Sequence, residues 1–487
     1  MSADAHSQGA VVAGDRMPAS PEPRTAGDGE RAGDRAASQP AASRVATPAR
    51  LLPLHGQIQH YAWGSPDAIY DLLGEPPAKQ PAAELWLGTH PVAPAEVDDA
   101  GRRRPAAELL GELPFLLKVL AAQKALSLQV HPDLAQARAG FDAEQRAGVP
   151  LDAPQRRYRD PNHKPELIVA LTPFRALAGI REPARTLAIV DAFGVAGLTA
   201  AFRPLAADPA RGAAAVLRTL LTLPRERGRA LAGEVTRAAA SAATRHDDED
   251  VTRAADLVGR LAAAHPGDVG IAAALLLNDV TLKPGEALFQ PAKLLHAYVH
   301  GVGIEIMATS DNVLRGGLTP KHIDVDELLR LVDPTPSGAP VLTAKTLRAG
   351  AGGLVRYWPV PVDDFVLAEA ICAGGEVTLS RPAVLLAIDG TVEVRVGDGT
   401  AAGPPAASST AAAGQPGGGT NGGRTDGGGT DGGAAGKVTG DLATAGSSIR
   451  LTRGQAAVVT APVTVTLRGT GRVFAARPGV RRAPRPA

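Results

Sequence analysis

The chain has 487 residues, which at ~150 residues per domain suggests about three domains. Its 51 Lys and Arg nearly balance its 50 Asp and Glu, so net charge favours neither nucleic acid nor a membrane surface as a partner. A single cysteine, Cys372, excludes an intramolecular disulfide framework and a cysteine-rich zinc site. The apolar runs are far shorter than the ~20 residues of a membrane-spanning helix. The N-terminus lacks the apolar core of a signal peptide, so a cytoplasmic protein is expected.

Composition and periodicity divide the chain into segments. Residues 1–50 are mainly Ala, Gly, Ser, Pro, Asp and Arg without periodicity, and we expect a disordered tail. Residues 51–182 and 278–340 read as strands, whereas apolar residues recur at helical spacing over 183–277.

The last part of the chain reads as a further all-β unit over 341–478. It contains a Gly-rich insertion at about 398–446 and is followed by a basic, Pro-rich tail at 479–487; both of these are expected to be disordered. An Asp389-Gly390 pair before the alternating residues 391–396 predicts a hairpin turn. The fold class expected is therefore mainly β with an α-helical insertion.

The stretch 125–133, ALSLQVHPD, alternates apolar and polar residues and predicts a strand that ends at Pro132. Gln129 and His131 lie two residues apart on its polar face, as two metal ligands would. A polar face with a chance histidine explains the same pattern. A second strand with a polar face, downstream at 162–171, favours the metal site.

Three further positions stand out by residue type. Lys118 interrupts an apolar strand, so it is paired or functional, or it is an edge lysine whose head reaches solvent. Arg315 and Lys321 flank Gly316-Gly317, which fits an oxyanion site or a charged surface loop equally well.

Six motifs in order make the chain resemble the type I phosphomannose isomerases over residues 51–332. They are YAWG at 61–64, AELWLGTHP at 83–91, SLQVHP at 127–132, NHKPE at 162–166, HAY at 296–298 and the segment 304–321. The resemblance implies a zinc-bearing, cupin-like catalytic domain interrupted by a helical domain and followed by a second jelly-roll domain.

The resemblance also implies roles for individual residues. It makes Gln129, His131, Glu166 and His296 the ligands of one zinc ion per chain. It makes Lys118, His163, Lys164, Asp311, Arg315 and Lys321 pocket residues, and the sequence leaves open which of them moves the proton and which holds the phosphate. Our own prediction places Lys118, Ser127 and Lys321 near the phosphate and gives acid–base work to His163, Lys164, Asp311 and Arg315. Trp63, Glu84 and Glu305 are added to the substrate pocket. The sequence departs from the family at Lys293-Leu-Leu, where a proline usually precedes the ligand histidine.

The reaction implied is interconversion of mannose 6-phosphate and fructose 6-phosphate by proton transfer through a cis-enediolate. A cytoplasmic monomer that feeds GDP-mannose synthesis, with no nucleic-acid or membrane partner, is the corresponding expectation. An iron oxygenase of the cupin class is disfavoured, because such sites generally take two histidines and one carboxylate without a glutamine. A catalytically inactive sugar-phosphate-binding protein is the other alternative.

Overall fold

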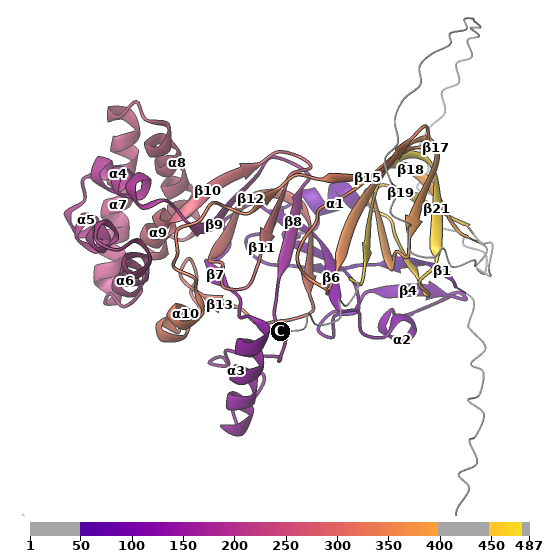
Figure 1. The fold of residues 1–487 in the computed structure, drawn as a ribbon, viewed down its shortest axis with the longest axis horizontal. Helices are drawn as coiled ribbons and strands as arrows, with labels where there is room; N and C mark the ends of the chain where they lie inside the picture. The colour runs from indigo at the N-terminus through magenta and orange to yellow at the C-terminus, as the bar shows by residue number, and fades with distance from the viewer. Residues whose placement is uncertain (1–48, 398–447, 480–487) are drawn as a thin grey trace, which may run out of the picture. The chain divides into compact units, whose positions relative to one another are not determined.

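The computed structural model describes residues 49–397 and 448–479 (Figure 1). The predicted Gly-rich insertion lies outside the described residues, as do the predicted tails apart from residues 49, 50 and 479. Within these ranges, no helix has the length and apolar character that a membrane crossing requires.

One antiparallel sheet carries most of the candidate site residues. Its main path runs β14-β11-β8-β12-β6-β3-β2, with β7, β9, β10 and β13 joined to it, so it has 11 strands within the described ranges. The strands are β2 (Gln57–Gln59), β3 (Glu84–Leu87), β6 (Phe115–Ala122), β7 (Gln129–Val130), β8 (Glu166–Ala170), β9 (Phe174–Ile180), β10 (Leu277–Leu282), β11 (Ala287–Gln290), β12 (His296–Ala308), β13 (Leu314–Arg315) and β14 (Val341–Leu342).

A second sheet combines strands from the first and last parts of the described chain. Its order is β15-β16-β17-β21-β18-β20-β1-β4-β5, with β19 beside β18. The strands are β1 (Leu51–His55), β4 (Glu96–Asp99), β5 (Arg102–Pro105), β15 (Lys345–Gly350), β16 (Gly353–Tyr357), β17 (Val366–Ser380), β18 (Val384–Val396), β19 (Ser448–Thr452), β20 (Ala456–Val459) and β21 (Thr464–Arg477). Because β1 pairs with β20, strands from the predicted first and last domains share this sheet, and the predicted domain boundaries stay a prediction.

Most helices occupy one segment between β9 and β10. They are α4 (Pro183–Phe193), α5 (Ala196–Phe202), α6 (Pro209–Leu221), α7 (Arg225–Arg245), α8 (Glu249–Ala264) and α9 (Gly270–Ala273), with 3₁₀ turns at Arg203–Ala206 and Ala274–Leu276. The others are α1 (Ala68–Leu73), α2 (Ala107–Leu110), α3 (Leu134–Arg146) and α10 (Val325–Leu331). Helices α4 to α9 share one buried apolar cluster with Leu177 of β9 and Leu277 of β10 (Figure 1). The expected mainly-β class with a helical insertion is confirmed.

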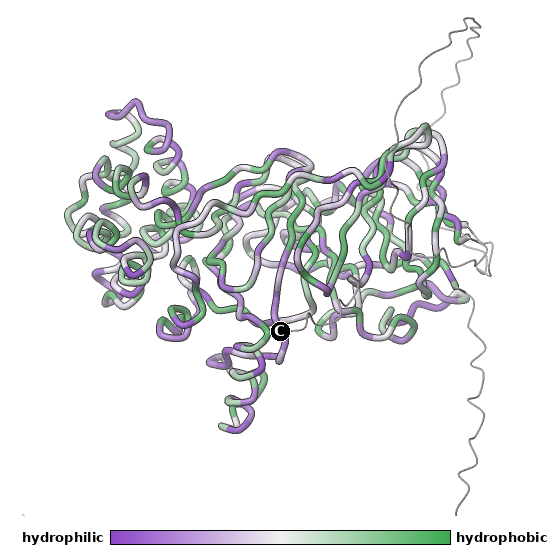
Figure 2. The backbone as a smooth tube through the Cα atoms, viewed as in Figure 1, coloured by the Kyte–Doolittle hydropathy of each residue, from purple (hydrophilic) through white to green (hydrophobic). Residues whose placement is uncertain are grey.

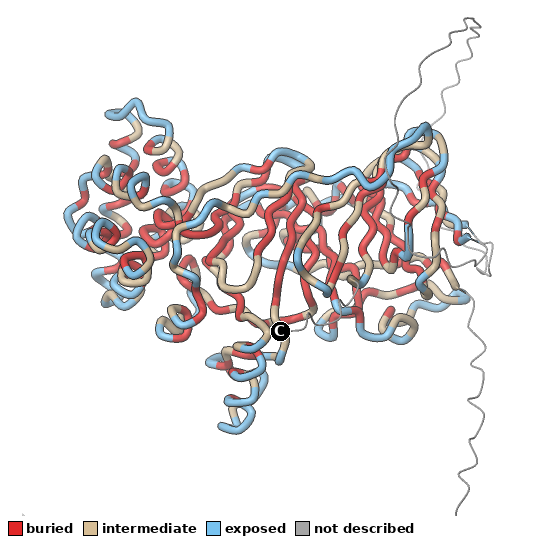
Figure 3. The backbone as a smooth tube through the Cα atoms, in the orientation of Figure 1, coloured by how far each residue is buried: buried red, intermediate tan, exposed pale blue. Residues whose placement is uncertain are grey.

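Strand alternation separates the core from the site. Leu117 and Val119 of β6, Leu167 of β8 and Ile304 of β12 belong to the apolar cluster that the two sheets share. Residues between them point to the opposite face, which carries the buried polar side chains, Lys118 among them. Figures 2 and 3 show these central strands as largely hydrophobic and buried.

Two local expectations need correction. Asp389-Gly390 is not a hairpin turn: β18 runs through it from Val384 to Val396, with an irregularity between Ala387 and Asp389. Gly390 adopts φ +67° there, as a β-bulge commonly requires, which explains why the pair resembles a turn in sequence. The strand predicted from residue 125 is only the two residues of β7. Cys372 is buried on β17 as expected, and burial raises its pKa to about 11.

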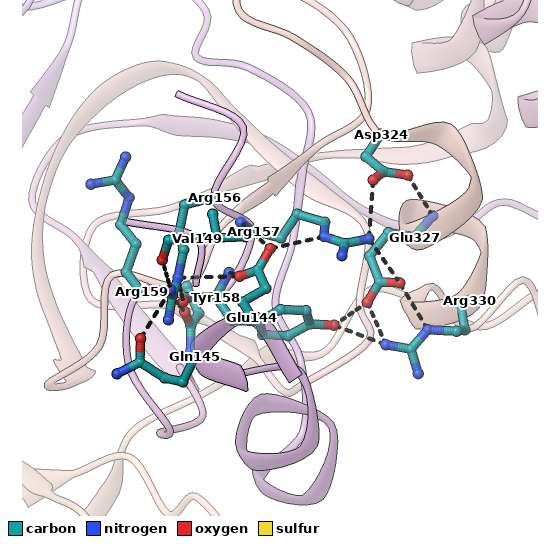
Figure 4. Close-up of polar contacts among 11 residues, drawn as sticks. Glu144, Gln145, Val149, Arg156, Arg157, Tyr158, Arg159, Asp324, Glu327 and Arg330 are labelled. Atoms are coloured by element: carbon teal, nitrogen blue, oxygen red, sulfur yellow. Dashed lines mark hydrogen bonds and ion pairs between the residues drawn. The ribbon is translucent and has the colours of Figure 1, made fainter. Parts of the chain in front are cut away.

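A buried ion-pair network fixes the loop that precedes the site (Figure 4). Glu144 of α3 accepts from the backbone N–H of Tyr158 at 2.9 Å and from Arg157 Nε at 3.1 Å. Arg157 in turn lies 3.3 Å from Asp324, which caps α10, and the Tyr158 hydroxyl donates to Glu327 of that helix. The loop is therefore tied to both α3 and α10.

We expect Glu144→Gln to lower the free energy of unfolding by about 3 kcal/mol. Among the described residues, Glu144 is the one carboxylate in contact with Arg156 and the Tyr158 amide, and breaking a buried pair costs about that much. Glu108→Gln is the matched control, because Glu108 is half exposed and lies 3.9 Å from Arg104, so a change below ~0.5 kcal/mol is expected. Thermal unfolding followed by circular dichroism compares the two; equal shifts would contradict a structural role for the network.

Candidate metal centre

His131, Glu166 and His296 form a buried cluster of potential metal ligands. One donor atom from each lies within 4.8 Å of the others. Glu166 begins β8 and His296 begins β12, while His131 directly follows β7. Because β12 pairs with both β7 and β8, it brings the three segments together.

The local sequence explains why the chain leaves β7 at His131. Pro132 follows, and a proline cannot donate a ladder hydrogen bond. Asp133 then caps α3: its Oδ1 accepts from the Gln136 N–H at 2.8 Å, and the Gln136 side chain accepts from the Asp133 N–H at 3.1 Å. This capping box starts the helix immediately after the ligand position.

Backbone carbonyls set the tautomers of both histidines. His131 Nδ1 lies 2.8 Å from the Asn312 carbonyl, and His296 Nδ1 lies 3.0 Å from the Leu294 carbonyl. A carbonyl only accepts, so each Nδ1 carries the proton and each Nε2 presents a lone pair. The two Nε2 atoms face the same Glu166 oxygen, at 3.4 and 3.3 Å.

This donor set fits a divalent metal. Burial lowers the pKa of His131 to about 4, so its imidazole is neutral near pH 7. Burial opposes the ionisation of Glu166, but the positive charge of Lys164 outweighs it and holds the pKa of Glu166 well below its usual range. Two lone pairs and an anionic oxygen therefore converge, and His131 Nε2 has no hydrogen-bond partner in the described part of the chain. Imidazole and carboxylate are ligands that Zn²⁺ prefers.

Gln129 is the fourth predicted ligand. Its backbone pairs with His296 on one side and Arg315 on the other, and its side chain is partly buried. The strand register thus brings Gln129 next to His296, while its role as a ligand stays a prediction. Lys293, in the loop where the sequence departs from the family, adopts φ 71° and donates its N–H to the His131 carbonyl at 2.8 Å.

Lys164 orients the cluster. Its Nζ lies 2.7 Å from Glu166 Oε1, so one carboxylate oxygen is held by the lysine and the other faces the imidazoles. Their i, i+2 spacing predicts that Lys164 and Glu166 lie on the same face of a strand, and this contact agrees with that prediction.

Lys118 lies in a second buried group on the same sheet. Its Nζ is 3.2 Å from Glu305 and 3.7 Å from Glu84. Trp86 Nε1 donates to Glu84 at 2.6 Å, and the Tyr298 hydroxyl donates to Glu305 at 2.7 Å. Burial alone would lower the pKa of Lys118, but the two carboxylates raise it. The contacts of Lys118 are thus with acids, and they give no support to its predicted position near a phosphate.

Neither Arg315 nor Lys321 forms an ion pair with an acidic residue in the described ranges. Burial and the charge of Arg159 lower the pKa of Arg315, and Arg315 is the main cause that lowers the pKa of Lys321. Arg159 was not predicted as a site residue, because nothing in its loop sequence indicates this neighbourhood. In Figure 4 its guanidinium points away from the Glu144 network.

The loop that joins Arg315 to Lys321 contacts the helical segment. A Cβ on Gly317 would lie 2.7 Å from the Gly270 Cα, and Gly317 adopts φ +130°. Asp268 accepts from the Thr319 N–H at 2.9 Å and from the Gly270 N–H at 2.7 Å. Gly317 and Gly270 are therefore required because the backbone of the loop and the backbone of α9 approach each other closely.

Two substrate-pocket predictions concern residues on neighbouring loops. Trp63 stacks on Tyr61 with ring centroids 5.6 Å apart. Ser127 is partly buried and lies beside Leu128, whose backbone bonds Gly316 and Gly317. Both roles stay predictions.

His163 does not join the cluster. Its Nε2 lies 3.0 Å from Asp364, and both residues line a cavity of about 690 Å³ together with Arg138 and Pro478. Lys164, the next residue, is bonded to Glu166, so the two side chains have different partners. The predicted acid–base role of His163 gains no support from these contacts.

Asp311 lies in the segment before β13 and keeps 42% of its side chain exposed. Its Oδ1 is 3.4 Å from Nε2 of His90, a residue for which no role was predicted. The only sign of His90 in the sequence is its place in the 83–91 motif.

Antiparallel sheets, a helical insertion and a buried His–Glu–His cluster together define a metal-binding enzyme of cupin-like architecture. Residues 51–183 match the family model described as "Phosphomannose isomerase type I, catalytic domain". The chain is 38% identical over 359 residues to mannose-6-phosphate isomerase of Escherichia coli (strain K12), covering 69% of this chain and 88% of that protein. The Homo sapiens mannose-6-phosphate isomerase is 32% identical over 385 residues, covering 70% and 88%.

A crystal structure of zinc-bound mannose 6-phosphate isomerase aligns with a TM-score of 0.70 at 30% identity, covering 88% of this chain and 100% of that one. The chain belongs to the type I mannose-6-phosphate isomerase family. The resemblance expected from the six motifs is confirmed.

We expect Glu166→Gln to lose most of its bound metal, because a neutral amide replaces the one anionic donor of the cluster. Glu376→Gln is the matched control: this carboxylate is exposed and pairs with Arg468 on the second sheet. Elemental analysis after equilibration with zinc and desalting measures both. Full occupancy in Glu166→Gln would contradict the assignment of Glu166 as a ligand.

Proposed function

We propose that the chain interconverts mannose 6-phosphate and fructose 6-phosphate, with one zinc ion held by Gln129, His131, Glu166 and His296. The observation that carries the proposal is the convergence of two Nε2 lone pairs and a carboxylate oxygen in a member of this family. A zinc ion supplies Lewis-acid stabilisation of negative charge on the sugar oxygens.

Isomerisation requires a proton to leave C2 and return to C1 through a cis-enediolate. Of the four predicted acid–base residues, we assign this transfer to Asp311. Its carboxylate is partly exposed, and its pKa is lowered because the hydrogen bond from His90 and the charges of Lys164 and Lys118 outweigh burial. An ionised carboxylate that substrate can reach is suited to general base catalysis. Lys164 is then left to hold Glu166 in place.

We assign the phosphate to Arg315 and Lys321, with Ser127 as a hydroxyl donor. The support is electrostatic: Arg315 lowers the pKa of Lys321, Arg159 lowers the pKa of both, and neither pairs with an acid in the described part of the chain. A dianion bound between them would relieve that repulsion. Trp63, Glu84 and Glu305 are assigned to the walls of the sugar pocket.

A cytoplasmic location is proposed on the grounds of the charged substrate, since a phosphate ester does not cross a bilayer unaided. The monomeric state and the role in GDP-mannose supply stay predictions from the resemblance.

The function is tested by a coupled assay that follows fructose 6-phosphate formed from mannose 6-phosphate. We expect turnover that a chelator abolishes and zinc restores, and solvent deuterium at C1 of the product when the reaction runs in D₂O. Mannose 6-phosphate binding without turnover in the zinc-loaded protein would instead indicate a catalytically inactive binding protein.

We expect Lys321→Ala to raise KM for mannose 6-phosphate by about tenfold or more with kcat within about threefold, since a hydrogen bond to a charged group is worth ~1.5–3 kcal/mol. Lys345→Ala is the control, because Lys345 is an exposed lysine on β15, and it should leave both constants unchanged. Steady-state kinetics measure both variants. An unchanged KM in Lys321→Ala would contradict the phosphate assignment.

A further inference from the structure

His90 is a buried histidine beside Asp311, and the mechanism above gives it no role beyond its effect on the Asp311 pKa. It follows β3, is 3% exposed, and packs edge-on against Trp86 with ring centroids 4.9 Å apart. Its Nδ1 accepts from the Val92 N–H at 3.3 Å. Because that nitrogen is the acceptor, the neutral ring carries its proton on Nε2.

The Nε2–H faces Asp311 Oδ1 at 3.4 Å. The backbone of Asp311 is held independently, since its N–H donates to Asp160 Oδ2 at 2.7 Å. Asp160 also accepts from the Ser310 hydroxyl at 2.8 Å. The main chain at Asp311 is thus fixed by Asp160, and His90 Nε2 is in contact with its carboxylate.

The titratable groups around Asp311 come from several elements. Lys118 on β6 and Lys164 just before β8 both lower the pKa of Asp311. Tyr61, which follows β2, is also near, because the charge of Asp311 raises the pKa of Tyr61. His90 is the group among them in direct contact with Oδ1. The lysines already have their own carboxylate partners, Glu305 and Glu166.

We infer that His90 is a positioning residue for the isomerisation: its Nε2–H holds the Asp311 carboxylate ionised and oriented toward the sugar carbons. The inference rests on the proposed function and on Asp311 as the base. A 3.4 Å contact in the substrate-free protein is compatible with this role, because catalytic hydrogen bonds often tighten only when substrate binds.

Two substitutions separate the two nitrogens of His90. In His90→Gln the amide N–H can take the place of Nε2–H and still reach Asp311. In His90→Asn the shorter side chain can still accept from Val92 but cannot reach Asp311. We expect kcat of His90→Gln within about threefold of wild type, and kcat of His90→Asn lower by about tenfold or more with KM little changed.

The pH profile gives a second readout that a merely structural role would not move. Loss of the donor raises the pKa of Asp311, so Asp311 becomes protonated at higher pH and the acid limb of kcat/KM shifts upward in His90→Asn. The limb should stay in place in His90→Gln. In an Asp311→Asn background, His90→Asn should cause no further loss of kcat, because the group it positions is already gone.

Three outcomes would overturn the inference while the wild type is active: near-normal kcat in His90→Asn, equal losses in both His90 variants with an unmoved acid limb, or additive losses with Asp311→Asn.

Zinc content and circular dichroism of each variant check folding. Should His90→Asn fail to fold, ¹⁵N NMR of the zinc-loaded wild type decides instead: an Nε2–H tautomer at His90 supports the inference, and an Nδ1–H tautomer overturns it. Absence of isomerase activity in the wild type would defeat the proposed function itself.

Discussion

The site depends on the two carboxylate oxygens of Glu166 having different partners. One oxygen bonds Lys164 at 2.7 Å, and the other faces the Nε2 atoms of His131 and His296. An anionic carboxylate is costly to bury, and the lysine offsets that cost without occupying the side that faces the imidazoles. The backbone carbonyls at Asn312 and Leu294 complete the arrangement, because they fix both lone pairs toward the same point.

Strand alternation lets a polar site of this kind exist inside a sheet. In β6, β8 and β12 every second side chain packs into the apolar cluster between the sheets, and the residues between them form the opposite, polar-bearing face. The charges on that face occur in matched sets: Lys164 with Glu166, and Lys118 with Glu84 and Glu305. Arg315 and Lys321 are the contrast, since they form no ion pair within the described ranges.

The sequence was most informative where chemistry is local. The i, i+2 spacing of Gln129 and His131, the strand around Lys118 and the helical segment could be read from periodicity, and the motif order identified the family. Pairings across the sheet could not be read in this way. That Lys118 lies opposite Glu305 follows from the register of β6 with β12, and that His163 faces Asp364 depends on how a loop of the second sheet approaches. His90 and Arg159 escaped notice for the same reason, because their partners are distant in the chain. Asp389-Gly390 led to the prediction of a hairpin turn where the strand continues through a bulge, because bulges and turns favour the same residues.

The close approach of Gly317 to Gly270 limits how the helical segment of this chain can be exchanged for another. The helical segment looks like an insert that could be exchanged between relatives, but α9 packs directly against the loop that joins Arg315 to Lys321, and Asp268 holds that loop at Thr319. A chimaera that takes its helical segment from a relative without a glycine at this position but keeps the present loop would place a side chain where the Gly317 and Gly270 backbones now touch. The insert and the loop therefore form one packed unit, and a substitution in α9 that changes this contact is expected to move the loop that carries Arg315 and Lys321.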